Sequence, residues 1–399
     1  MDRHGPLQGL KVLELGQFVA GPFCSRLLAE FGADVIKVEP PGTGDGLRKW
    51  REMVGETSLW WYLQGRNKKS VTIDLRHPDG QALIRRLAGE VDVVVENFRP
   101  GTLERWGLGW EQLHQLYPRL IMVRISGYGQ DGPYRDKAGF GSVGESLGGI
   151  RFVTGFPDRP PVRAGISLGD SVAGIYGALG TMMAVYHRDV TGSGEGQMVD
   201  VALYEAVFSL MEAMLPEYDR FGHVRERTGN RLPGVAPTST YTCGDGRFAV
   251  IGANGDGIFR RFMTAIGRPD LAGEPRFQSN EGRAAAADFL DEVIEDWTRQ
   301  RSLEAVLAVC DESGTPAGRI YSVADMVSDP QYAARAMIRT AMLPDGPVRM
   351  PGIVPRLSGT PGDIDWVGPG LGEHTAEVLT GLLGLTVAEL KALQERKVV

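Results

Sequence analysis

The sequence predicts an α/β protein, with a doubly wound parallel sheet in its first 130 residues and a smaller α+β region further along. Two observations indicate this class. Apolar strand patterns alternate with helical patterns from Leu10 onwards, and the first β-α-β unit is only about 30 residues long, which implies parallel strands joined by a right-handed crossover. The 399 residues are enough for two or three domains with sizeable cores.

The first region reads as a regular alternation of elements. Apolar patterns predict strands over 10–15, 33–38, 70–75, 91–96 and 120–126, and helices over 23–31, 78–88 and 111–117. Residues 127–169 are dense in Gly and Pro, which predicts a long irregular stretch of the kind that compact domains keep for function.

The next predicted helix, 171–186, carries Gly174, Gly177 and Gly180 at every third position. Glycine lowers helix propensity but lets another backbone approach, so we expect a buried helix packed closely on a neighbour. The later elements are predicted as strands at 197–201, 240–242, 248–252 and 337–343 and helices at 202–214, 258–266, 283–298, 303–313, 373–383 and 386–394.

Composition excludes several function classes. The 43 Lys and Arg against 50 Asp and Glu give a net charge of −7, without the basic excess of a nucleic-acid-binding protein. The three cysteines and six scattered histidines lack metal-ligand spacing, so we expect no metal site. The absence of a secretion signal and of a long apolar run predicts a cytoplasmic protein without a membrane partner.

Glycine is the unusual residue, with 54 of 399, about twice the ordinary usage. Two of these glycines bound the turn after the first predicted strand, Gly16 and Gly21. This turn lacks the G-x-G-x-x-G of dinucleotide-binding proteins, and the chain has no G-x-x-x-x-G-K-[ST] phosphate loop. A plain strand-to-helix turn, with Pro22 at the start of the helix, is the alternative interpretation.

Asp170 lies between the irregular stretch and the glycine-rich helix. Its position alone fits a helix N-cap, whose carboxylate accepts a hydrogen bond from a free amide. It also fits a nucleophile, because helix amides favour an ionised carboxylate and the glycines nearby leave room for a substrate. A carboxylate that attacks an acyl centre forms a mixed anhydride. The two interpretations are compatible.

The chain resembles the class III coenzyme A transferases along nearly its whole length. The resemblance rests on LQGLKVLEL (7–15), VAGPF (19–23), GADVIKVEPPGTGD (32–45), NKKSVTIDL (67–75), VENFRPGTLERWGLG (95–109), ISGYGQDGPY (125–134), GDSVAGIYGALG (169–180) and LGEHTAEVL (371–379). It implies a CoA-transferase with a Rossmann-like large domain, a smaller α+β domain and an interlocked-ring homodimer.

The resemblance implies site residues one by one. Asp170 matches the catalytic aspartate, which forms a mixed anhydride and an aspartyl-CoA thioester in turn. Matches to CoA contacts are Val19, Ala20, Ile73, Leu75, Arg76, Asn97, Phe98, Arg105 and, approximately, Lys137. A substrate loop is expected at Phe140, Gly141, Gly252, Asn254 and Gly255. Pro40 stands where the oxalate enzyme of the family has an arginine, and the glycine loop 252–255 is shorter, which suggests a reduced lid.

The resemblance indicates the substrates less directly than it indicates the site residues. The segment 138–145 is similar to family members that use succinyl-CoA with a small or branched dicarboxylate such as citramalate, mesaconate, itaconate or glutarate. The alternatives are a formyl-CoA:oxalate type of enzyme, an acyl-CoA racemase and a non-catalytic CoA-binding protein. Racemisation is disfavoured because Phe140 stands where the racemase has its proton-transferring histidine. Candidate cations for the far carboxylate of the acceptor are Arg48, Arg163 and Arg227.

The predicted domain division has five parts. Residues 1–215 form the first part of the large domain, 216–237 a linker, 238–325 the small domain, 326–350 a return linker and 351–399 the last part of the large domain. We expect no tightly bound cofactor, since coenzyme A thioesters are substrates here, and no nucleic-acid partner.

Overall fold

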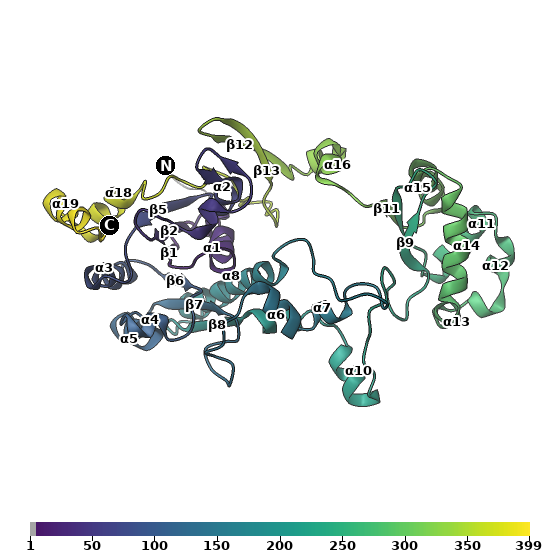
Figure 1. Ribbon diagram of the computed structural model, residues 1–399, viewed down its shortest axis with the longest axis horizontal. Helices are drawn as coiled ribbons and strands as arrows, with labels where there is room; N and C mark the ends of the chain where they lie inside the picture. Colours follow the sequence, from purple (N-terminus) through teal and green to yellow (C-terminus); the bar gives the residue numbers. More distant parts are fainter. Residues whose placement is uncertain (1–4) are drawn as a thin grey trace. The chain divides into compact units, whose positions relative to one another are not determined.

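The computed structural model describes residues 5–399, which form two compact units (Figure 1). The first unit comprises the described residues up to Ile150 together with Arg163–Gly222 and Arg335–Val399. The second unit comprises Arg151–Val162 and His223–Ala334. The second unit therefore consists of two segments, which alternate along the chain with the three segments of the first.

A six-stranded parallel sheet is the centre of the first unit. Its strands lie in the order β5 (Lys68–Thr72), β2 (Asp34–Glu39), β1 (Lys11–Glu14), β6 (Val93–Glu96), β7 (Ile121–Ser126) and β8 (Met198–Ala202). Numbered by their place among these six, the strands follow the order 3-2-1-4-5-6 of a doubly wound dinucleotide-type fold. The predicted α/β class with a parallel sheet is confirmed.

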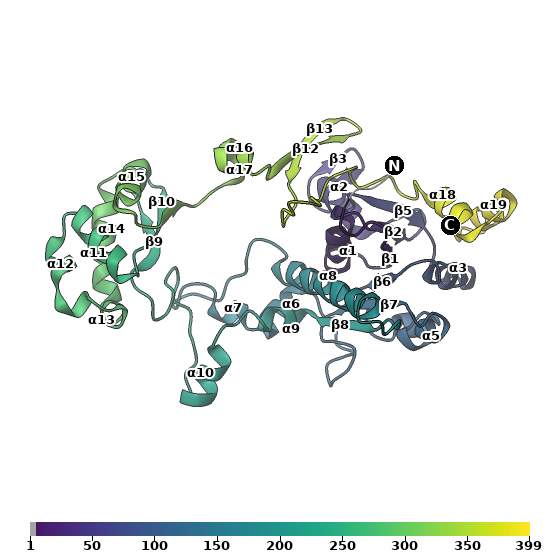
Figure 2. The ribbon, with the colours of Figure 1, turned by 180° about the vertical axis from the view of Figure 1, so that it is seen from behind.

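Helices cover both faces of this sheet (Figures 1 and 2). One apolar core joins the sheet to α1 (Ala20–Glu30), α8 (Leu168–Asp189) and α9 (Leu203–Phe208). The other joins it to α3 (Pro78–Ala88), α4 (Thr102–Arg105), α5 (Trp110–Leu116), α18 (Thr375–Leu383) and α19 (Val387–Glu395). The arrangement explains why the strands are apolar on both sides.

The remaining elements of the first unit are short. They are η1 (Gly46–Lys49), β3 (Met53–Val54), β4 (Thr57–Ser58), α2 (Leu59–Gln64), α6 (Gly141–Leu147), α10 (Met214–Phe221), β12 (Ile338–Leu343) and β13 (Gly346–Pro351), with α7 (Ile150–Val153) at the border of the units. The hairpin β12–β13 packs on Trp61 and Tyr62, which is why part of the predicted return linker belongs to the first unit.

The close packing predicted for the glycine-rich helix is present on one face of α8. A Cβ atom at Gly174 would lie 3.0 Å from Ala20 O on α1, and one at Gly177 would lie 3.0 Å from Cys24 Sγ. The opposite face, with Ile175, Leu179 and Met183, is exposed in the single chain. Within residues 5–399, α8 is also the one helix whose length and hydropathy satisfy the test for a membrane span, a property that it shares with core helices of soluble domains.

The second unit is an antiparallel sheet with helices. The strand order is β11 (Ala317–Arg319), β10 (Phe248–Gly252) and β9 (Thr238–Thr242). The helices are α11 (Asp256–Ala265), α12 (Pro269–Gly273), η2 (Pro275–Phe277), α13 (Asn280–Ala285), α14 (Ala287–Arg299), α15 (Leu303–Ser313), α16 (Val323–Ser328) and α17 (Pro330–Ala334). Phe259, Phe262 and Ile294 are completely buried in its core.

Three local expectations were wrong. The predicted helix 202–214 already ends at Phe208, as α9, and the chain turns through Glu212 at a φ of 49° before α10 begins at Met214. The predicted helix 283–298 is interrupted at Ala286. Residues 151–162, placed by the sequence in the large domain, join the second unit, where Gly229 N donates to Gly155 O at 2.9 Å.

Candidate active site

The candidate site begins at the carboxyl ends of β1 and β6, where the strand order reverses. Asn97, just after β6, bridges to the turn after β1: Gln17 N donates to Asn97 Oδ1 at 2.7 Å, and Asn97 Nδ2 donates to Gln17 O at 2.8 Å. A Cβ atom at Gly16 would lie 3.0 Å from Asn97 Oδ1. The crevice at such a reversal is the usual ligand site of doubly wound sheets.

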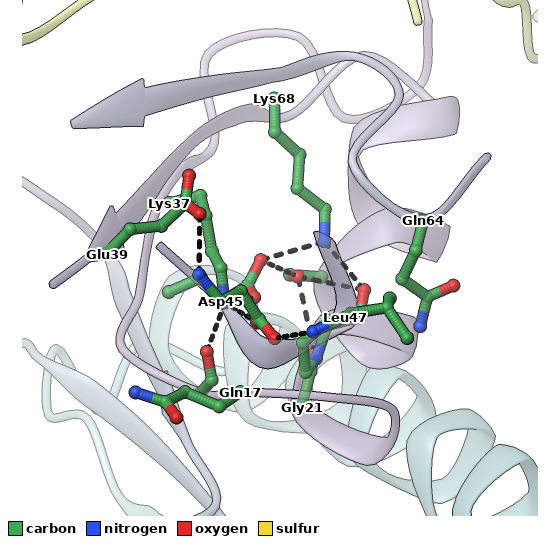
Figure 3. Close-up of polar contacts among 12 residues, drawn as sticks. Gln17, Gly21, Lys37, Glu39, Asp45, Leu47, Gln64 and Lys68 are labelled. Carbon is green, nitrogen blue, oxygen red and sulfur yellow. Dashed lines mark hydrogen bonds and ion pairs between the residues drawn. The ribbon is translucent and has the colours of Figure 1, made fainter. Parts of the chain in front are cut away.

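Buried charged side chains contact the turn after β1, and Figure 3 labels Lys37, Asp45 and Lys68 among them. Lys37 Nζ on β2 lies 2.8 Å from Glu14 Oε1 and 2.8 Å from Asp45 Oδ2, and it also donates to the carbonyl of Gly16. Asp45 in turn accepts a hydrogen bond from Phe18 N at 3.0 Å, which fixes Phe18 at a φ of 63°. These contacts fix the conformation of the turn, because Lys37 on β2 binds both the carbonyl of Gly16 and the Asp45 carboxylate that holds Phe18.

The same network keeps the Glu14 carboxylate ionised. Burial alone would raise the pKa of Glu14, but Lys37 and Lys68 outweigh it and lower that pKa to about 2. Lys68 Nζ lies 2.8 Å from Glu14 Oε2 and donates to Pro22 O at 2.7 Å, so it also connects β5 to the first turn of α1.

Asp170 lies in the first turn of α8, three residues after the N-cap Ser167. The N-cap interpretation of Asp170 was therefore wrong, because the helix begins earlier than the sequence pattern indicated. Burial, together with repulsion by Glu145, raises the pKa of the Asp170 carboxyl to about 6, although Arg163 acts in the opposite direction. A carboxylate held at such a pKa is mostly ionised at neutral pH but poorly stabilised by solvent.

Gly141, the first residue of α6, faces this carboxylate. A Cβ atom there would lie 2.2 Å from Asp170 Oδ2, closer than any real side chain permits. Gly169 N donates to Glu145 Oε1 at 3.2 Å, which links the start of α8 to α6. Gly141 therefore has a direct steric role, because any side chain at this position would collide with the Asp170 carboxylate.

Two cavities in the first unit collect most of the predicted residues. A cavity of about 690 Å³ is lined, among others, by Val19, Ala20, Asn97, Phe98, Lys137, Phe140, Gly141, Arg163 and Asp170. A second, of about 830 Å³, is lined by Ile73, Leu75, Arg76 and Phe98 among others. Gln17 and Phe98 line both, so the two cavities adjoin across the reversal point of the sheet.

Some predicted residues lie elsewhere. Arg105 lines neither cavity, and its guanidinium donates to Thr102 Oγ1 at 3.1 Å. Gly252, Asn254 and Gly255 belong to the second unit, where Asn254 O accepts a hydrogen bond from the buried Arg283 at 2.6 Å. Neither glycine has a positive φ, so the bend between β10 and α11 does not use their freedom. A substrate loop there stays a prediction.

The structure separates the three candidate arginines for the acceptor. Arg48 is buried and bound to Glu39 at 2.7 Å and to Pro369 O at 3.1 Å, so it is unsuited to a substrate. Arg227 lies in the second unit and donates to Phe152 O at 2.8 Å. Arg163 lines the Asp170 cavity.

Sequence reasoning missed further cations of the Asp170 cavity, namely Arg51, Arg99 and Arg135. Arg99 directly follows Phe98 in a segment already singled out, and that adjacency was a usable signal. The other two come from irregular segments, whose approach to the cavity has no local pattern. Among residues 5–399 no group of three metal-ligating side chains comes together.

A doubly wound sheet with a carboxylate beside the crevice at its reversal point defines the broad class: an α/β protein with a ligand-binding crevice. The sequence pattern of CoA-transferase family III matches residues 7–375. The chain therefore belongs to CoA-transferase family III and is a CoA-transferase.

Individual relatives agree with this assignment. The chain is 56% identical to the succinyl-CoA–D-citramalate CoA-transferase of Chloroflexus aurantiacus, over 99% of this chain and 98% of the relative. It is 35% identical to the succinate–glutarate CoA-transferase of Agrobacterium fabrum, over 96% of each chain. The crystal structure of a CaiB/BaiF family protein from Brucella suis matches with a TM-score of 0.84 at 36% identity, covering 95% of this chain and 100% of that one.

Proposed function

We propose that the enzyme transfers CoA from succinyl-CoA to a small or branched dicarboxylate of the citramalate type, with Asp170 as the nucleophile. The proposal rests on the Asp170 carboxylate, which lines a cavity, has a pKa raised to about 6 and faces Gly141, a residue with no side chain to obstruct it. The substrate class follows from the Chloroflexus relative, which is named for succinyl-CoA and D-citramalate.

The chemistry proceeds through two carbonyl centres. The Asp170 carboxylate attacks the thioester carbonyl of succinyl-CoA, which forms a mixed anhydride and releases the CoA thiolate. The thiolate then attacks the aspartyl carbonyl of the anhydride, which gives an aspartyl-CoA thioester and free succinate. The acceptor carboxylate attacks that thioester, and the released thiolate finally attacks the acceptor's own carbonyl, which yields the new acyl-CoA and restores Asp170.

The surroundings of Asp170 suit these steps. Two of these four attacks are made by the CoA thiolate, so CoA has to stay bound between the steps, and the adjoining second cavity offers room for the rest of the CoA molecule. Arg163 supplies a cation in the same cavity as Asp170, and we assign to it the far carboxylate of the acceptor. An ion pair between Arg163 and this second carboxylate would favour a dicarboxylate over a simple fatty acid, which has none.

A donor-only labelling experiment tests the covalent step. Incubation with succinyl-CoA alone, followed by hydroxylamine, is expected to modify the peptide that contains Asp170, as seen by mass spectrometry. Asp170→Ala should abolish the labelling and lower turnover at least about 1,000-fold while the folded protein still binds CoA. Transfer at the original rate by Asp170→Ala would refute the aspartyl mechanism.

We further infer a cytoplasmic homodimer without a tightly bound cofactor. The apolar face of α8 with Ile175, Leu179, Met183 and Tyr186 is exposed in the single chain, and a second copy would cover it. The cysteines Cys24, Cys243 and Cys310 are free and buried, which agrees with a reducing compartment.

A further inference from the structure

The second cavity, of about 830 Å³, is lined by residues that the sequence did not predict as CoA contacts, Lys397 among them. It adjoins the Asp170 cavity through Gln17 and Phe98, so a CoA molecule whose sulfur lies near Asp170 would place its nucleotide end there. The nucleotide end carries phosphates, and a phosphate site needs cations. Of the residues that line this cavity, Arg76 and Lys397 are the cationic ones.

Lys397 is held in place by the way α19 ends. Lys397 N donates to Gln394 O at 2.9 Å and Val398 N donates to Leu393 O at 2.9 Å, the paired bonds of a Schellman motif. Val398 is completely buried, and its carbonyl accepts a hydrogen bond from Asp74 N at 2.8 Å. The backbone of Lys397 is thereby fixed at the edge of the cavity beside the segment that contains Arg76.

The residue type at this position is unusual for its backbone. Lys397 has a φ of 54°, a left-handed conformation that disfavours side chains. Three other helices of this chain, α10, α15 and α18, end with a glycine in the same conformation, namely Gly222, Gly314 and Gly384. A lysine in place of glycine costs stability at this position, which makes a role for its side chain worth testing.

The charge of Lys397 is also available. The described ion pairs of α19 involve its neighbours: Arg396 pairs with Asp79, and Lys391 with Glu395. The side chain of Lys397 is exposed. Asp74, two residues before Arg76, also lines this cavity, and its carboxylate accepts a hydrogen bond from Arg76 N at 2.9 Å. Lys397 therefore adds a positive charge to a cavity with few others.

We propose that Lys397 binds the 3′-phosphate on the ribose of the CoA substrate, as a partner of Arg76. The inference deepens the proposed function, because it assigns a new residue to the binding of the same substrate. It also explains why the final turn of α19 carries a lysine where glycine would be more stable.

Comparing succinyl-CoA with succinyl-3′-dephospho-CoA separates the loss of a contact to the 3′-phosphate from a general loss of activity. We expect Lys397→Gly to raise the KM for succinyl-CoA about five- to tenfold, with little change for succinyl-3′-dephospho-CoA, since one exposed charge-assisted contact is lost. The melting temperature of the same variant should stay equal or rise, because glycine relieves the left-handed strain. Lys397→Arg should keep the original KM, and Lys391→Met on the same helix is the matched control.

Binding of adenosine 3′,5′-bisphosphate, measured by calorimetry, tests the inference without any turnover. Lys397→Gly should weaken it about five- to tenfold. An unchanged affinity, or an equal rise in KM for both CoA esters, would overturn the role of Lys397 while leaving the transferase function intact. If the bisphosphate binds as expected but no acyl-CoA donor supports transfer, the proposed function fails and the phosphate contact stands.

Discussion

At the scale of single residues, the Asp170 carboxylate and the Gly141 backbone form one functional unit. The carboxylate is buried enough to have a raised pKa, and Gly141 provides the only kind of residue that tolerates its position. A misplacement of about 1 Å can cost about 100-fold in rate, so the addition of a single methyl group at Gly141 is informative.

Gly141→Ala is therefore expected to displace the Asp170 side chain and to lower kcat at least about 100-fold. Gly165→Ala is the matched control, because a Cβ atom there would meet nothing within 4 Å. The measurement is steady-state transfer together with thermal unfolding, to show that both variants are folded. Full activity in Gly141→Ala would mean that the carboxylate does not react from this position.

The raised pKa of Asp170 has a consequence for pH dependence. The ionised form is the nucleophile, so kcat/KM for the donor should fall as the pH drops through about 6. Glu145→Gln removes the repelling charge and keeps an oxygen for Gly169 N, so the acid limb should move to lower pH. An acid limb that does not move in this variant would contradict the electrostatic coupling of the two residues.

At the scale of elements, the buried network under the turn after β1 joins strands β1 and β2 to the segment that carries Asp45. Lys37→Met would leave the carboxylates of Glu14 and Asp45 buried without their shared partner. We expect a loss of about 3–5 kcal/mol in the free energy of unfolding. Denaturant unfolding measures it, and Lys49→Met, an exposed lysine on η1, should change stability far less.

Element positions also show what the sequence could predict. The helix α3 begins and ends where the pattern placed it, at Pro78 and Ala88, because Pro78 marks its start and the apolar spacing is local information. The start of α8 was placed three residues late, since Gly169 has low helix propensity and its amide is satisfied by Glu145, a partner 24 residues away. Such a partner has no signature in the local pattern.

The residues of the candidate site likewise divide into those that the sequence predicted and those that it did not. Asp170, Gly141 and Asn97 were found through motif resemblance, and they line one cavity. Arg48 was misjudged because a basic residue in a sequence gives no sign of its ion-pair partner, here Glu39. The cations Arg51 and Arg135 were missed because irregular segments bring them to the cavity.

At the scale of the whole molecule, the exposed apolar face of α8 predicts assembly. Met183→Glu places a charge in the centre of that face and should shift a homodimer toward monomer in analytical ultracentrifugation. Val387→Glu, at an exposed position in the first turn of α19, is the control and should leave the oligomeric state unchanged. A monomeric parent protein would refute the inferred homodimer directly.

The order of segments along the chain has a further consequence for folding. Leu379, Leu390 and Leu393 complete the apolar core on one face of the parallel sheet, yet they follow the whole second unit in the sequence. Completing that core requires contacts between residues separated by some 300 positions, so during synthesis this face of the sheet is covered only by α3, α4 and α5 until α18 and α19 emerge. The nucleotide-sized cavity, one edge of which Lys397 provides, thus forms among the last features of the molecule, and a nascent chain cannot hold CoA in full before then.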